Sequence, residues 1–155
     1  MVFYSCIPDG GPTSMQTESP SWIWTRECAF PSGMGTAHSL IGEVMDVVRA
    51  NQWNEKDLFA IELVLEESLT NAVKHGNHSD PSKHVRFDCK LSQHKIYVRV
   101  EDEGTGFNPH ALPDPRDPAN QTVVSGRGVL LISHFATKVT WNERGNVVEF
   151  EKERS

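Results

Sequence analysis

Residues 55–76 read EKDLFAIELVLEESLTNAVKHG, and this stretch has the clearest helical pattern in the chain. The preceding Asn54 is a typical N-cap, and the acidic residues of the first turn suit the helix dipole. Apolar residues recur along the stretch at helical spacing, at Leu58, Ile61, Leu65, Leu69 and Ala72. We therefore predict a long helix that ends near Gly76 and buries this apolar stripe.

The opposite side of the same helix is polar. At about 100° per residue, Glu67, Asn71, Lys74 and His75 fall roughly opposite the apolar stripe. A polar helix face is most often an ordinary solvated surface. A ligand-binding role for these residues needs support from other parts of the chain.

Residues before and after this helix predict a sheet and its connections. Residues 22–30 are rich in aromatic and β-favouring types, and the apolar spacing from about Gly35 predicts a first helix. Residues 85–91 and 96–100 alternate between apolar and polar side chains, and Ser92 to Lys95 forms the hairpin loop between them.

The C-terminal third completes the fold. An apolar helix opens at Val129, and residues 139–141 and 147–150 form a closing hairpin. Because most strands are joined by hairpins, the economical arrangement is a mostly antiparallel sheet covered on one face by three helices. We predict an α+β fold, a two-layer α/β sandwich.

Size and composition limit the classes of protein to consider. The 155 residues, 37% of them hydrophobic, suit one domain over 21–155, preceded by a flexible N-terminal tail over 1–20. A net charge of -6 argues against direct nucleic-acid binding. The chain has no apolar run of membrane length and no signal-peptide pattern, and its three cysteines have no metal-ligand spacing. We expect no membrane association and a cytoplasmic location.

Three polar segments from separate parts of the chain carry the functional signal. They are ESLTNAVKHG at 67–76, DEGTGF at 102–107 and SGRG at 125–128. In this order they resemble the N, G1 and G2 boxes of the GHKL ATPases (gyrase, heat-shock protein, histidine kinase, MutL), which share the Bergerat-type ATP-binding fold. The proline-rich, irregular residues 108–125 between the last two segments are typical of a functional lid or a disordered insert, and the resemblance favours the lid.

Physical reasoning supports the roles that this resemblance implies. An Asn71 amide oxygen suffices for Mg²⁺, because a phosphate-bound Mg²⁺ keeps several waters. Glu67 lies one helical turn earlier, where its carboxylate can activate an attacking hydroxyl as a general base. Asp102, at a strand end, is placed to accept a hydrogen bond from the adenine amino group.

The resemblance also implies that further residues within or beside the three segments contact ATP. These contacts are assigned to Lys74, His75, Gly104, Gly106, Phe107, Gly126, Arg127, Gly128 and Val129. Glycines let the backbone approach a base or phosphates, and an arginine adds charge-assisted hydrogen bonds.

Within the superfamily, the short lid that leads into residues 125–132 resembles the anti-sigma-factor serine/threonine kinases. That resemblance implies ATP and Mg²⁺ as cofactors and two protein partners, a sigma factor and an anti-anti-sigma (STAS-type) protein that is phosphorylated on serine. It also implies a homodimer, for which the face near Trp22, Trp24 and the first helix is a candidate.

Two alternatives stay open at the level of sequence. One is a non-catalytic, ATP-dependent module that sequesters a partner, and the other is an ATPase-like domain of a different bacterial signalling pathway. Glu67 favours the kinase. His75, His78 and His84 lack a complementary zinc-binding pattern and are better interpreted as surface or loop residues.

Overall fold

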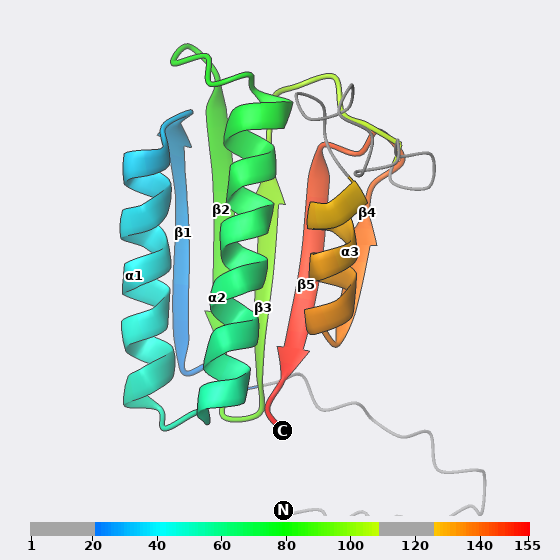
Figure 1. Ribbon diagram of the computed structural model, residues 1–155. Helices are drawn as coiled ribbons and strands as arrows, with labels where there is room; N and C mark the ends of the chain where they lie inside the picture. Colours follow the sequence, from blue (N-terminus) through cyan, green and yellow to red (C-terminus); the bar gives the residue numbers. More distant parts are fainter. Residues whose placement is uncertain (1–20, 109–125) are drawn as a thin grey trace, which may run out of the picture.

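The computed structural model describes residues 21–108 and 126–155 (Figure 1). The predicted tail, 1–20, and nearly all of the predicted lid lie outside these residues. The elements are β1 (Trp24–Pro31), α1 (Met34–Ala50), α2 (Glu55–Thr70), η1 (Asn71–Gly76), β2 (His84–Leu91), β3 (Lys95–Glu101), α3 (Gly126–Phe135), β4 (Lys138–Trp141) and β5 (Val147–Glu153).

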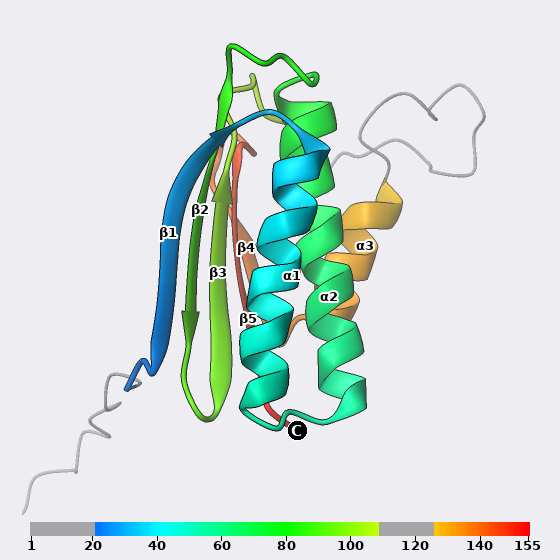
Figure 2. The same ribbon diagram turned by 90° about the vertical axis from the view of Figure 1, so that its left-hand side faces the viewer.

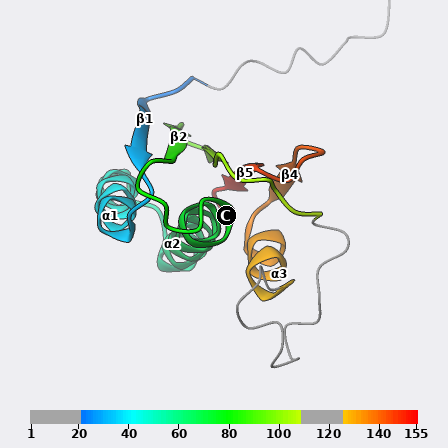
Figure 3. The ribbon, with the colours of Figure 1, turned by 90° about the horizontal axis from the view of Figure 1, so that it is seen from above.

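One sheet forms the first layer. Its strand order is β1-β2-β3-β5-β4, and every neighbouring pair of strands is antiparallel. Figure 2 and Figure 3 show α1, α2 and α3 together on one face of this sheet. The predicted α+β class and two-layer arrangement are confirmed.

Alternation along the strands explains the burial of one sheet face. Val85, Phe87, Cys89 and Leu91 of β2 are all at most 1% exposed. Cys89 lies opposite Val98 of β3, and Phe87 lies opposite Val100, so these side chains share the face beneath the helices. The predicted half-buried strands are therefore confirmed.

Helix α2 packs as its sequence pattern predicts. All five residues of the apolar stripe, Leu58, Ile61, Leu65, Leu69 and Ala72, are at most 6% exposed. The Asn54 side chain accepts a hydrogen bond from the Asp57 backbone N–H at 2.9 Å, which confirms the N-cap. This stripe and the buried strand face form the core.

None of the described helices covers the outer face of the sheet, which carries paired charges. Lys95 contacts Glu151 at 3.1 Å, and Arg99 contacts Glu101 at 2.7 Å. Trp24 packs against the hydrophobic core, and Trp22 packs against the Tyr97 ring at 6.5 Å between centroids. Both tryptophans thus have intramolecular partners.

No helix among the described residues is long and apolar enough to span a membrane.

Asp57 joins the start of α2 to the end of the chain. Its side chain is fully buried, and it accepts hydrogen bonds from the Ser155 hydroxyl at 2.7 Å and the Ser155 backbone N–H at 2.9 Å. Lys152 lies 3.2 Å away. Burial alone would raise the pKa of Asp57, but these contacts outweigh burial and lower it.

We expect Asp57→Asn to lower the free energy of unfolding by about 2 kcal/mol, because hydrogen bonds to a buried charge are lost and Lys152 loses its counter-ion. Urea denaturation measures the change. Asp46→Asn is the control, since Asp46 is exposed and its ion pair within the described residues is an exposed contact with Arg49. Equal stability of the two variants would contradict a stabilising role for Asp57.

Candidate nucleotide-binding site

Helix α3 brings the last predicted segment against the polar face of α2. A Cβ atom added to Gly128 would lie 2.8 Å from Glu67 Oε2 and 3.4 Å from Asn71 Nδ2. A side chain at this position would displace the Glu67 carboxylate and pack directly against Asn71. The glycine therefore permits the close approach of Glu67, Asn71 and the N-terminal turn of α3, where free backbone N–H groups favour anions.

The start of α3 differs from the prediction. The sequence places Gly126 and Gly128 in a turn before a helix that opens at Val129, but α3 begins at Gly126. Both glycines thus belong to its first turn. Close packing of this turn on Glu67 has overridden the low helix propensity of glycine.

The end of the long helix also differs from a regular α-helix. After Thr70 the chain continues as a π-helical turn, η1, through Asn71 to Gly76. The buried Asn77 follows it, donates to Ser32 Oγ at 2.9 Å, and accepts from the Glu103 backbone N–H at 2.8 Å. This turn therefore ties the Asn71 segment to the glycine loop after β3. Such π turns are frequent at functional sites.

Asp102 lies at the inner end of a pocket between the helices and the sheet. It is 8% exposed, and its carboxylate lies so close to Gly76 that a Cβ atom added there would overlap it. Burial raises the pKa of Asp102 to about 6, although the Gly104 backbone N–H and nearby Arg144 oppose the shift. A buried, ionisable acceptor at this position is suited to an amino group.

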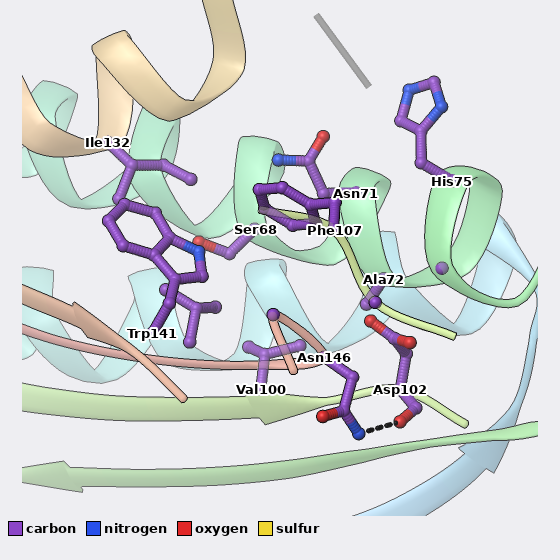
Figure 4. A pocket seen from close by; sticks show the side chains of 14 residues that line it. Ser68, Asn71, Ala72, His75, Val100, Asp102, Phe107, Ile132, Trp141 and Asn146 are labelled. Atoms are coloured by element: carbon purple, nitrogen blue, oxygen red, sulfur yellow. Dashed lines mark hydrogen bonds between the residues drawn. The ribbon is translucent and has the colours of Figure 1, made fainter. Parts of the chain in front are cut away.

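Figure 4 shows how this pocket is arranged, with Asp102 and Asn146 at one end, Trp141 and Ile132 at the other, and His75 at the rim. Its lining is Ser68, Asn71, Ala72, His75, Gly76, Val100, Asp102, Gly106, Phe107, Ile132, Trp141, Gly145, Asn146 and Val148. An apolar chamber with a few polar groups is typical of small-molecule sites.

The turn between β4 and β5 holds the glycine loop in place. Arg144 Nη2 donates to the Gly104 carbonyl oxygen at 2.7 Å, and Asn146 Nδ2 donates to the Asp102 carbonyl oxygen at 2.9 Å. Gly106 has φ +81°, and a Cβ atom added to it would overlap the Arg144 carbonyl oxygen. The backbone contact between loop and turn thus requires glycine.

Most of the predicted site residues gather here. Asn71, His75, Asp102, Gly106 and Phe107 line the pocket. Glu67 and Gly128 meet beside it, Gly104 hydrogen-bonds the Asp102 carboxylate, and Val129 is buried. Lys74 and Arg127 are exposed, and neither lines the pocket.

The charge of two polar side chains depends on their surroundings. Burial raises the pKa of Glu67, the neighbouring Glu66 raises it further, and Arg127 lowers it. Burial lowers the pKa of His75, and Lys74 and His78 act in the same direction. A carboxylate with a raised pKa is a better proton acceptor, as a general base requires.

Sequence reasoning assigned no role to several residues that shape the pocket. These are Ser68, Trp141, Arg144 and Asn146. In the sequence, Ser68 stands out only because it lies next to Glu67. The other three residues come from the closing hairpin, whose pattern predicts a pair of strands and nothing more.

The described residues thus form a single antiparallel sheet under three helices, with a pocket between the two layers. Residues 30–152 match the family described as "Histidine kinase-like ATPase domain". The chain belongs to this family.

Curated relatives agree with the predicted resemblance to anti-sigma kinases. Over 106 residues the chain is 29% identical to the anti-sigma F factor of Oceanobacillus iheyensis and 28% identical to that of Bacillus subtilis. Each match covers 64% of this chain and 71% of the relative.

A solved structure shares the fold. The crystal structure of the RsbU and RsbW domains of a Mycobacterium tuberculosis protein superimposes with a TM-score of 0.55 at 13% identity. The match covers 84% of this chain and 32% of that chain.

Proposed function

We propose that this protein is an ATP-binding anti-sigma regulator that phosphorylates a serine or threonine of an anti-anti-sigma partner and sequesters a sigma factor. The observation that carries the proposal is the meeting of Glu67, Asn71 and Gly128 beside a pocket that ends at Asp102. In this proposal Glu67 is the proton acceptor, the start of α3 binds the phosphates, and the adjacent pocket binds the base. The similarity to anti-sigma F factors supports the choice of partners.

The described residues fit ATP with Mg²⁺. Asn71 offers an amide oxygen beside the first turn of α3, and a magnesium ion held mainly by phosphates needs few protein oxygens. When bound there, Mg²⁺ would neutralise phosphate charge. The backbone N–H groups at the start of α3 would bind the phosphates, and Asp102 would accept from the adenine amino group.

Glu67 supplies the chemistry of transfer in this proposal. Its carboxylate takes the proton of the partner's hydroxyl as that oxygen forms a bond to the γ-phosphorus. The bond between the γ-phosphorus and the β–γ bridging oxygen breaks, and ADP leaves with the electron pair. The raised pKa of Glu67 brings its basicity closer to what proton transfer near neutral pH requires.

The direct test is incubation with ATP labelled at the γ-phosphate and candidate partners encoded in the same genome. Label on a serine or threonine of an anti-anti-sigma protein is the expected result. ATP binding and sigma-factor binding without any transfer would contradict the kinase and favour a sequestering module.

We expect ATP affinity to fall as the pH falls through about 6, because Asp102 must be ionised to accept fully from the amino group. When the pH is lowered from 7.5 to 5, the dissociation constant for ATP should increase in both proteins. The factor of increase should be up to about ten times larger for wild type than for Asp102→Asn. Calorimetry at several pH values measures both proteins. Protonation of the ATP phosphates affects both proteins equally and therefore cancels in the comparison. Identical pH profiles of wild type and Asp102→Asn would contradict this role of Asp102.

A homodimer through the face of β1 and α1 is part of the same proposal. At that face Arg26 of β1 contacts Glu43 of α1 at 3.0 Å, and β1 is an edge strand. Edge strands leave backbone groups free for pairing with another chain. Light scattering of the purified protein would measure the expected dimer mass.

A further inference from the structure

Ser68 is a buried residue whose hydroxyl has no partner. It is 1% exposed, and its Oγ is one of two buried side-chain polar atoms without a hydrogen-bond partner in the part of the chain that the structure describes. Buried polar groups are normally hydrogen-bonded, and an exception usually has a functional explanation. Ser68 also lines the pocket.

Other serines of this protein show that the unpaired state is unusual. Buried Ser32 donates to the Lys83 carbonyl oxygen at 2.9 Å, and buried Ser92 donates to the Lys95 carbonyl oxygen at 3.1 Å. On a helix, Ser39 donates to the Gly35 carbonyl oxygen at 3.1 Å. Ser68 lies on a helix and forms no such bond.

The surroundings of Ser68 separate it from the phosphate end of the site. Its side chain is turned about 100° from Glu67, toward the sheet. In Figure 4 its oxygen points to the side of the pocket where Trp141 and Ile132 lie, away from Asp102. The adjoining wall, Val100 and Val148, is apolar. A ligand in this chamber therefore meets one hydroxyl on an apolar wall.

We propose that Ser68 is a specificity-determining residue whose hydroxyl hydrogen-bonds a ring nitrogen of the bound adenine, directly or through one trapped water. The inference rests on the proposed function, in which Asp102 binds the amino group of the same base. Two polar groups on different walls then fix the orientation of the ring. Leaving the hydroxyl unpaired without nucleotide costs stability, which binding restores.

This cost gives the proposal a distinctive test, because Ser68→Ala removes an unpaired hydroxyl. Without nucleotide, thermal denaturation should give a Tm equal to or above that of wild type. With Mg²⁺ and ATP, calorimetry should give a dissociation constant raised about three- to tenfold. Ser39→Ala is the matched control, since it removes a hydroxyl from an exposed helix face, and its ATP affinity should equal that of wild type.

ATP analogues that lack one ring nitrogen identify which nitrogen of adenine accepts the hydrogen bond from Ser68. Among 1-deaza-, 3-deaza- and 7-deaza-ATP, at least one should bind wild type more weakly than ATP and lose most of that penalty in Ser68→Ala. An unchanged ATP affinity, a lowered Tm without nucleotide, or equal analogue penalties in both proteins would overturn the proposal. A wild-type protein that does not bind ATP would instead contradict the proposed function itself.

Discussion

Glu67→Gln is expected to slow phosphate transfer to a partner serine by about 10²- to 10⁴-fold while leaving ATP affinity nearly unchanged. Glutamine keeps the size of the side chain and one acceptor oxygen, so its contact with the start of α3 can persist. It lacks the basicity needed to take the proton of the hydroxyl. Single-turnover transfer from labelled ATP, together with calorimetric binding, measures the two effects separately.

Asn71→Ala is the informative comparison, because it removes the proposed magnesium ligand one helical turn later. This variant should weaken Mg²⁺-dependent ATP binding as well as transfer, since the metal organises the phosphates before reaction. The two defects therefore differ in kind. Transfer by Glu67→Gln at the wild-type rate would refute the general base and make a sequestering module the better interpretation.

Asp102→Asn is expected to weaken ATP binding about tenfold or more. An asparagine has one acceptor fewer and presents a donor that can face the adenine amino group, and a lost or reversed buried hydrogen bond costs about 1 to 3 kcal/mol. The circular dichroism spectrum of the variant must match that of wild type, because Asp102 also accepts from the Gly104 backbone N–H at 2.8 Å. A folded variant with wild-type affinity would reject the assignment.

The sequence predicted those parts of the fold that depend on local periodicity. Helical spacing alone predicts the burial of Ile61 and Leu65, and the alternation around Phe87 suffices to place β2 in the sheet. The joint order of the three polar segments predicted that Asp102 and Asn71 would line one pocket.

The remaining features depend on contacts between distant parts of the chain. Arg144 reaches the Gly104 carbonyl oxygen across 40 positions, and Asn146 reaches Asp102 across 44. No spacing rule links such residues. Asn77, which follows the π-helical turn, likewise has hydrogen-bond partners in distant segments, at Ser32 and Glu103. Ser68 was missed because its missing partner is visible only in the folded chain.

Calorimetric titration of the full chain with ATP and with GTP, both with Mg²⁺, tests most directly whether the pocket selects an adenine nucleotide. GTP presents a carbonyl where ATP presents the amino group, so the Asp102 carboxylate should repel it. We predict saturable ATP binding, and GTP binding that is at least about tenfold weaker. Equal affinity for the two nucleotides, or binding of neither, would contradict this prediction.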